Sequence, residues 1–293
     1  MQALKQGEIA VYNYCVSFID LLGQKDALSG QGLVPQFKSD EEHKDFIQTI
    51  KKTIGAITSL QEDAKVMLED SSEVKRISFN GVAQLIQDEM RKEKVTKQHW
   101  SDGFVSYVCL GEPEIKCPMN GIHSIIALAG ILCFLGLGKG QPIRGAIDVA
   151  WGVELTPGEL YGAAIARAYE LESEIAQYPR IVVGTAMASY LKVQIATEPQ
   201  DIYAQTNKML AELCLSMLLE DVDGALIIHY LGEDFQAALT RVWHPKMYKE
   251  AREFVVQELG KHRELEASKL AFRYAHLLRY FDKYPPNPNG RKK

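Results

Sequence analysis

The sequence predicts an α+β fold in which helices pack on an antiparallel sheet. Three observations lead to this class: a buried strand that ends at Asp20, an Asp-Gly hairpin at Asp102, and long amphipathic segments between the strand-like runs. The predicted order is strand, helices, hairpin, helix, hairpin, helix and strand, which is typical of α+β domains. A chain of 293 residues is also long enough to bury a substantial core.

The first strand is predicted over residues 11–20, where an apolar run leads directly to Asp20 and a glycine breaks the strand soon afterwards. This pattern is typical of a buried strand that carries one carboxylate to the edge of a sheet. A second carboxylate, Asp102, lies in an Asp-Gly pair between the strand-like runs 95–100 and 104–110. Asp-Gly between such runs is a strong signal for a β-hairpin. If these strands are neighbours, the two aspartates can converge on one metal site.

Helical spacing of apolar residues predicts a helix over about 41–69, with Ser39 or Asp40 as its N-cap, and another amphipathic stretch over 74–94. An almost charge-free segment at 121–137 predicts a helix buried in the core or in an interface. This segment is slightly short of the roughly 20 residues that a membrane span needs, so we do not expect membrane insertion.

The later elements follow from the same signals of periodicity and turn residues. They are a strand over 142–151 that Gly152 turns into a return strand at 153–155, a helix over 160–176, a strand over 180–184, a helix over 206–220, a strand over 225–231 and a helical region over 246–283. No internal repeat, low-complexity segment or linker in the sequence divides the chain.

Net charge, cysteine spacing and the N-terminal sequence argue against several classes of protein. The formal net charge of −5 gives no reason to expect general binding of nucleic acid. The five cysteines form no Cys-x-x-Cys pair and lie mostly in apolar runs, which favours reduced, buried thiols over a disulfide framework. The N-terminus lacks the layout of a signal peptide, so we expect a cytoplasmic protein.

Four motifs, in this order along the chain, resemble those of the class III nucleotide cyclases. They are Phe18–Gly23, Ser101–Gly103, Pro142–Ile147, and Glu159–Gly162 with the Leu-Glu-Ser ending at 171–173. The resemblance covers about residues 11–184. Within the superfamily it is greatest to the bacterial pyrimidine nucleotide cyclases of Pycsar antiphage defence, which share the long stretch between the two aspartates and a helical C-terminal extension.

The resemblance implies a domain organisation. It places a cyclase-like catalytic domain with a ferredoxin-like antiparallel sheet over residues 1–200, interrupted by a helical insertion over about 25–94. A mainly helical extension over 201–293 is expected to pack on the same domain. Because class III sites form at the seam between two catalytic domains and this chain holds one, a symmetric homodimer is also implied.

The resemblance further implies a site for two Mn²⁺ or Mg²⁺ ions made by Asp20, Asp102 and the backbone carbonyl of Leu21. Such hard cations take oxygen ligands, and the substrate phosphates and water supply the remaining ones. In the implied reaction the 3′-hydroxyl attacks the α-phosphate and pyrophosphate leaves, with ions and positive charge doing most of the catalysis. The alternative interpretation is two unrelated aspartates in turns.

Nucleotide-binding residues are implied around these acids. Leu22, Gly23 and Gln24 would offer backbone N–H groups to the phosphates, and glycine permits a close approach. Lys25 would add a point charge to the triphosphate, or would be a solvated surface lysine. Arg144 lies on a predicted strand, as either a phosphate ligand or a structural ion-pair partner.

The chain departs from the family pattern on the helix that follows the Tyr-Gly motif. Most class III cyclases carry an Asn and an Arg there, whereas this chain has Ala166 and Glu170. Arg167 is the candidate to replace the missing arginine as a catalytic residue. Its alternative is a surface arginine paired with Glu170 or Glu172.

A second departure concerns the base. Gln98 occupies the position of the lysine that contacts a purine, and Glu159 occupies the other base-contacting position. We therefore expect a pyrimidine nucleotide cyclase that uses UTP, or CTP as second choice, and whose cyclic product is read by a separate effector protein during phage infection. The alternatives are a purine cyclase and an inactive, dimeric binding module of the same fold.

Overall fold

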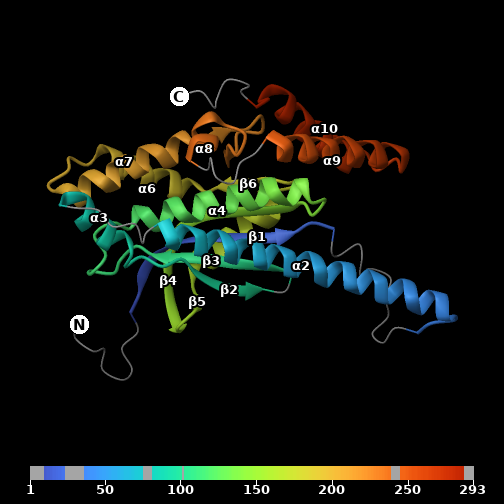
Figure 1. Cartoon of the computed structure of the whole chain (residues 1–293), viewed down its shortest axis with the longest axis horizontal. Coiled ribbons are helices and arrows are strands. Elements are labelled where there is room, and N and C mark those ends of the chain that lie inside the picture. Colours follow the sequence, from blue (N-terminus) through green and yellow to red (C-terminus); the bar gives the residue numbers. More distant parts are fainter. Residues whose placement is uncertain (1–9, 24–35, 75–80, 101, 239–244, 287–293) are drawn as a thin grey trace.

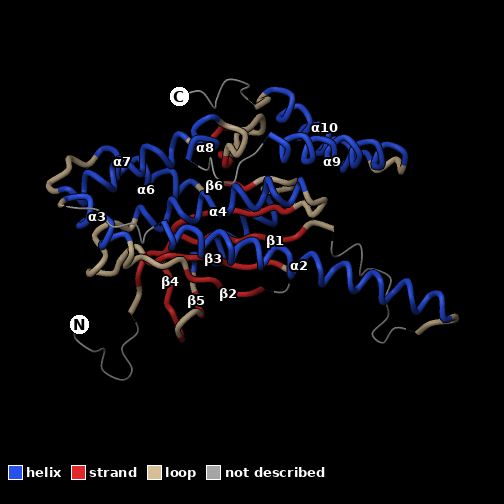
Figure 2. Tube along the Cα trace, in the orientation of Figure 1, coloured by secondary structure: helices blue, strands red, loops and turns tan. Residues whose placement is uncertain are grey.

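The computed structural model describes residues 10–23, 36–74, 81–100, 102–238 and 245–286 of the chain. In these residues an open, mixed sheet of eight strands is covered by helices, so the predicted α+β class is confirmed (Figure 1). The strands follow the order β2-β3-β1-β4-β6-β8-β7, and β5 pairs with β4 outside this path. In the view of Figure 2, β3 and β2, drawn in red, lie below α4, β4 and β5 extend further down, and β6 lies above α4.

The strands are β1 (Tyr12–Leu21), β2 (Thr96–Trp100), β3 (Gly103–Cys109), β4 (Ile143–Thr156), β5 (Glu159–Tyr161), β6 (Ile181–Val183), β7 (Leu218–Glu220) and β8 (Leu226–Ile228). The helices are α2 (Asp40–Val74), α3 (Val82–Met90), α4 (Met119–Gly138), α5 (Ala163–Glu170), the π-helix η1 (Leu171–Ile175), α6 (Thr185–Ala196), α7 (Ile202–Ser216), α8 (Glu233–Ala238), α9 (Pro245–Glu264) and α10 (Ser268–Lys283).

The prediction that the sheet is antiparallel was wrong in one respect. β1 runs antiparallel to both β3 and β4, but β4 and β6 are parallel. Parallel neighbours require a crossover connection, and α5 with η1 supplies it. The crossover cannot be read from local patterns, because it depends on where β6 returns to the sheet.

The predicted hairpin around Gly152 was also wrong. β4 continues through this glycine to Thr156, and its return partner is β5. The chain reverses instead at the Pro-Gly pair that ends at Gly158, whose φ of +91° suits a residue without a side chain. Because residues 159–161 pair with β4, the following helix begins at Ala163 rather than at 160.

The C-terminal half contains elements that the sequence did not predict. The helices α6 and α8 and the short strand β7 were missed, and the helical region over 246–283 is two helices. The break between α9 and α10 includes Glu266, whose positive φ of 53° interrupts the helical backbone.

The two faces of the sheet bury different clusters because side chains alternate along a strand. On β1, Cys15, Ile19 and Leu21 join the main core. The intervening Val16 and Phe18 join a smaller cluster with α5. Asp20 therefore lies on the α5 face, opposite the main core.

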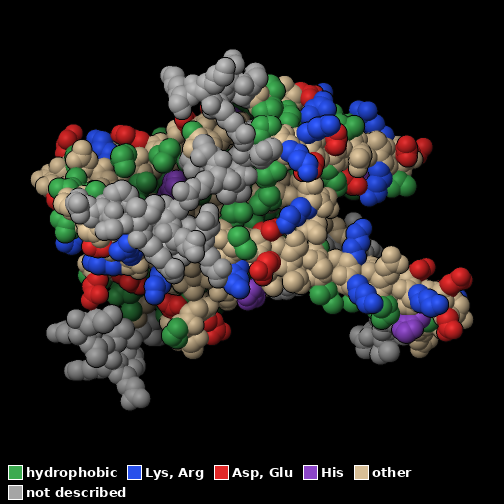
Figure 3. Space-filling view, viewed as in Figure 1, with side chains coloured by type: hydrophobic (Ala, Val, Ile, Leu, Met, Phe, Trp, Pro, Cys, Tyr) green, Lys and Arg blue, Asp and Glu red, His purple; other side chains and the backbone are tan. Residues whose placement is uncertain are grey.

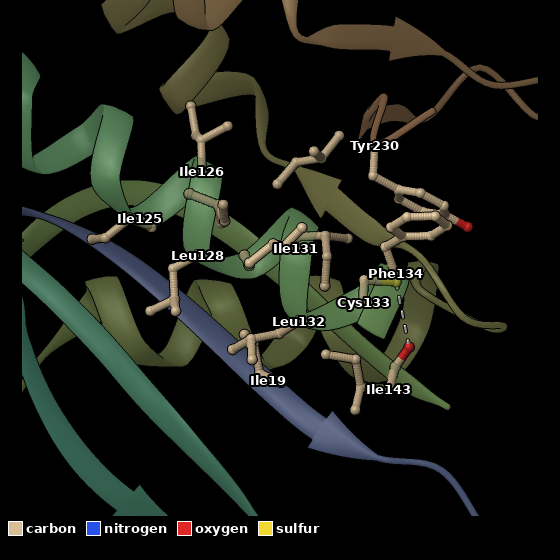
Figure 4. Packing of buried hydrophobic residues seen from close by; sticks show 14 of the residues in the cluster. Ile19, Ile125, Ile126, Leu128, Ile131, Leu132, Cys133, Phe134, Ile143 and Tyr230 are labelled. Carbon is tan, nitrogen blue, oxygen red and sulfur yellow. Dashed lines mark hydrogen bonds between the residues drawn. The ribbon is translucent and has the colours of Figure 1, made fainter. Parts of the chain in front are cut away.

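The main core is built around α4. Figure 4 shows the aliphatic side chains of α4 packed above Ile19, with Phe134 beside Tyr230. The thiol of Cys133 donates to the carbonyl oxygen of Ile143 at 3.9 Å. α4 is long and apolar enough to cross a membrane, yet 72% of its most apolar window is buried inside the protein. This burial is consistent with the core helix of a soluble protein.

The C-terminal segment is joined to the same sheet. β8 pairs with β6 at Val182 and Ile227, and β7 pairs with β8. α9 packs on α4 and on α10. On the other side, the N-terminal part of α2 projects away from the sheet, and charged side chains gather at its far end (Figures 1 and 3), including the acids at Asp40–Glu42.

Candidate functional site

The candidate site begins with two charged residues on adjacent strands. Asp20 on β1 and Arg144 on β4 are directly opposite each other in the antiparallel register. Their side chains point to the α5 face, and Oδ2 of Asp20 lies 3.8 Å from Nη2 of Arg144. Each side chain is 24% exposed, so this ion pair is partly shielded from water. Arg144 thus forms an ion pair in the structure, and its role as a phosphate ligand stays a prediction.

Asp102 is brought to the same place by the predicted hairpin, which is confirmed. β2 and β3 pair from Thr96 to the closing pair Trp100 and Gly103, so Asp102 lies in the turn between these two strands. A side chain at Gly103 would meet the carbonyl oxygen of Ile19 at 2.0 Å and Cα of Asp20 at 3.1 Å. Only glycine therefore allows the hairpin tip to lie against the end of β1.

The electrostatics of Asp20 reflect this crowding. Burial, the nearby carboxylates of Asp102 and Glu172, and a hydrogen bond with Asp102 raise the pKa of Asp20 to about 7, although Arg144 opposes the shift. A carboxyl that is partly removed from water and surrounded by like charge holds a proton near neutral pH. Raised pKa values of this kind are common at functional sites.

Glu172 is the site residue that the sequence did not predict. It comes from the π-helix η1, its side chain is 2% exposed, and Oε1 contacts Nε of Arg144. Burial raises the pKa of Glu172, Asp102 raises it further and Arg144 opposes the rise. Nε of Arg144 and Oε1 of Glu172 form no well-aligned hydrogen bond in spite of the contact. Its place in the Leu-Glu-Ser motif was the only signal in the sequence.

These acids have the chemistry of a site for hard divalent cations. Within the described ranges, no group of three or more His, Cys, Asp or Glu side chains is arranged to hold an ion by itself. Two carboxylates are sufficient where phosphate and water oxygens complete the shell, as is usual for Mg²⁺. A cation between Asp20 and Asp102 would offset the repulsion between their carboxylates, so the residues fit the expected ion.

The expected phosphate-binding turn is only partly described. The N–H of Leu22 donates to the carbonyl oxygen of Pro142 at 2.9 Å, so this predicted donor is already engaged. Gly23 is exposed, has a φ of +87° and has open space around it. Leu21 is the last residue of β1. Gln24 and Lys25 lie outside the described residues.

The two predicted base-contacting residues lie beside each other. Oε1 of Gln98 accepts a hydrogen bond from the N–H of Leu160 at 3.1 Å, which places β2 against β5. The neighbouring Glu159 is exposed, and its Oε2 accepts from the hydroxyl of Thr156 at 3.0 Å. Gln98 thus lies on the strand that leads to the hairpin of Asp102, whereas Glu159 lies on β5.

Arg167 is not gathered with the carboxylates of Asp20 and Asp102. Its Nε and Nη2 both lie 2.9 Å from Oδ2 of Asp148, a fully buried side chain on β4. Asp148 is four residues beyond Arg144, which corresponds to about 13 Å along a strand. Asp148 also accepts from the N–H of Met187 at 2.9 Å, so the partner of Arg167 is fixed by α6.

Aromatic residues border the carboxylates on the α5 face. The ring of Phe18 lies 6.1 Å from that of Trp100 and 5.4 Å from that of Tyr169, measured between centroids. Trp100 and Tyr169 remain 47% and 52% exposed. An exposed aromatic border next to a charged site is a surface suited to a ring-bearing ligand or to another protein subunit.

Fold and site together define an α+β protein with a cluster of two aspartates, one glutamate and one arginine at the end of β1. No protein-family model matches the chain, and a search of curated proteins finds no matching relative.

Proposed function

We propose that the protein is a nucleotide cyclase that converts UTP, or CTP as second choice, to the 3′,5′-cyclic nucleotide and pyrophosphate. The observation that carries the proposal is the position of Asp102 against the end of β1, where its charge helps to raise the pKa of Asp20 to about 7. Two acids forced together at a strand end form a strong cation site when a divalent ion is present. The resemblance to the class III cyclases supplies the reaction.

Each residue of the cluster has a part in this proposal. Asp20, Asp102 and the carbonyl of Leu21 would hold two Mn²⁺ or Mg²⁺ ions, which supply positive charge to the phosphates when bound. Arg144 provides a further positive charge beside Asp20, and buried Glu172 restrains its guanidinium. Positioning and charge stabilisation are what phosphoryl transfer mainly requires of a protein.

The choice of base rests on Gln98 and Glu159. Neither residue carries the positive charge with which a lysine contacts a purine, and Gln98 is restrained by its hydrogen bond to the backbone at Leu160. A site built to hydrogen-bond one base edge can reject another by several powers of ten. An amide can donate to O4 of uracil or accept from N4 of cytosine, so the preference for UTP rests on the resemblance to the pyrimidine cyclases.

The biological setting is part of the same proposal. The enzyme acts in the cytoplasm as a homodimer, and its cyclic product is a second messenger for a separate effector in antiphage defence. Arg167 remains the candidate for the missing transition-state arginine, which would require it to leave Asp148. The same position of Arg167 favours the second candidate function, an inactive cyclase-like dimer that binds a nucleotide without turnover.

The test is incubation of the purified protein with each of the four ribonucleoside triphosphates and Mn²⁺, with products identified by mass spectrometry. We expect cyclic UMP, or cyclic CMP, as the main product, and its loss in Asp20→Asn and Asp102→Asn. Asp88→Asn, a change to an exposed aspartate on α3, is the matched control that keeps activity. Cyclic AMP or cyclic GMP as the main product would establish a purine cyclase, and no product from any nucleotide would favour the binding module.

A further inference from the structure

A cavity of about 520 Å³ lies between α10 and the segment 174–180, beside the turn that joins β7 to β8. The π-helix η1 separates it from the carboxylate cluster, because Glu172 contacts Arg144 whereas Glu174 lines the cavity. The volume falls within the range of about 300–1,000 Å³ that is usual for small-molecule sites. The proposed cyclase reaction makes no use of this cavity.

One wall of the cavity is a buried, rigid polar network. The guanidinium of Arg180, whose side chain is 3% exposed, donates to Asp221 at 2.7 Å, to Asp223 at 2.6 Å and to the carbonyl oxygen of Ile175 at 2.6 Å. His276 from α10 lies 3.0 Å from the second carboxylate oxygen of Asp221. The two carboxylates outweigh the single charge of Arg180, whose buried Nε has no hydrogen-bond partner within the described ranges.

The opposite wall and rim are formed by α10, and they carry charge that is not neutralised. Lys269 has no ion-pair partner among the residues described, and Arg273 makes one hydrogen bond, to Oε1 of Gln177 at 3.1 Å. These two cations are four residues apart, so they lie on the same side of the helix. Partial burial and repulsion by Arg144 lower the pKa of Arg273. An anion at this position would relieve the repulsion between the arginines.

The cavity also has an apolar rim that is exposed to water. Val222 and Phe272 are 84% and 75% exposed, the two highest values for large hydrophobic side chains in the described part of the chain, and both line this cavity. Phe272 immediately precedes Arg273 on α10. An exposed phenylalanine beside paired cations offers a flat apolar surface next to positive charge.

From this arrangement we propose that the cavity is a second ligand site, which binds a planar ring that bears an anionic group, of mononucleotide size. The ring lies against Phe272 and Val222, and the anionic group binds Lys269 and Arg273. The network around Arg180 sets one guanidinium against two carboxylates, so it shapes the base of the site and adds no positive charge to it. The proposal does not depend on catalysis at Asp20, because the two sites lie on opposite sides of η1.

Isothermal titration calorimetry in EDTA with UMP and AMP as probes tests this proposal, and uridine and inorganic phosphate serve as partial ligands. We expect both monophosphates to bind, and each partial ligand to bind at least about tenfold more weakly. Phe272→Ala and Arg273→Ala should each weaken binding of the monophosphates by at least about tenfold. Arg279→Ala, which removes an exposed arginine from α10 outside the cavity, should leave binding unchanged.

The outcome for Asp20→Asn separates the two sites. Unchanged affinity of this variant supports a separate site, even if the protein proves to have no cyclase activity. Loss of binding in Asp20→Asn would place the monophosphate at the carboxylates and overturn the proposal. Equal affinity of wild type, Phe272→Ala and Arg273→Ala would overturn it too, as would the absence of binding by every probe at millimolar concentration.

Discussion

Asp20 and Arg144 face each other across β1 and β4 with Oδ2 and Nη2 3.8 Å apart, a separation too long for a hydrogen bond. The same arginine is in closer contact with Glu172. Arg144 is thus shared between two acids. Its positive charge lowers the pKa of each, but the pKa values of both Asp20 and Glu172 remain raised. The cluster as a whole has an excess of negative charge that a cation would satisfy.

Removal of the Asp20 charge should stabilise the metal-free protein. The folded-state pKa of about 7 lies well above the ordinary value of an aspartate, about 4, so the wild type loses stability as the pH rises from about 4 to about 7. In EDTA at pH 8, Asp20→Asn should raise the free energy of unfolding by up to about 4 kcal/mol. Urea unfolding measures the change, with Asp88→Asn as a neutral control. If Asp20→Asn were less stable than the wild type at pH 8, the inferred repulsion of Asp20 by Asp102 and Glu172 would be contradicted.

The charge of Glu172 should also act on Asp20. In Glu172→Gln one like charge is removed and Arg144 becomes available to Asp20, so we expect the pKa of Asp20 to fall. NMR titration of protein labelled with ¹³C at the aspartate carboxyls measures this pKa. Glu174→Gln changes an exposed neighbour on the same π-helix and should leave it unaltered. An unchanged titration in Glu172→Gln would show that the two acids are not coupled.

Gly103 should tolerate no side chain. In Gly103→Ala the new Cβ would lie 2.0 Å from the carbonyl oxygen of Ile19, so β1 and β3 must separate locally. We expect a loss of at least about 3 kcal/mol in unfolding free energy, or failure to fold. Gly55→Ala, within α2 and with nothing within 4 Å, should instead be neutral or gain up to about 1 kcal/mol. Thermal melts of both variants give the comparison.

His229 should make the fold sensitive to acid. Burial lowers its pKa to about 4, with Lys283 contributing, so the neutral ring is the folded form. Stability from this residue is complete above about pH 6.5 and is lost as the pH falls towards 4. Between pH 7 and pH 5 the wild type should lose about 2 kcal/mol more than His229→Gln. His99→Gln, a change to an exposed histidine, is the control. If His229→Gln kept the pH dependence of the wild type, His229 would be excluded as the source of the acid sensitivity.

The aromatic border next to Asp20 should be covered in a homodimer. Trp100 and Tyr169 are about half exposed and contact the same buried ring of Phe18. Light scattering should give twice the mass of the chain. In the double variant Trp100→Ala/Tyr169→Ala the measured mass should fall towards that of a single chain. Phe272→Ala, which removes an exposed ring elsewhere, should leave the dimer intact. A monomeric wild type that turns over at low concentration would exclude the dimeric site.

Local patterns in the sequence predicted the elements that carry the two aspartates. The apolar run before Asp20 and the Asp-Gly pair at Asp102 depend on neighbouring residues, and both were correct in the structure. Apart from the expected convergence of these two aspartates, long-range relationships were not predicted. Glu172 joins the site through a π-helix, in which one extra residue per turn changes the direction of a side chain. The contact between Arg180 and Asp221 joins residues 41 positions apart, which no local pattern reveals.

The pairing of β6 with β8 makes the last third of the chain part of the same folding unit as the first strand. β8 contributes Ile227 opposite Val182, and β6 in turn lies beside β4, which pairs with β1. A truncation near residue 200 would therefore remove two strands and leave the backbone of β6 as an open edge, which is prone to pair with other chains. The C-terminal segment cannot be detached as an independent module, and the chain should melt in one cooperative step.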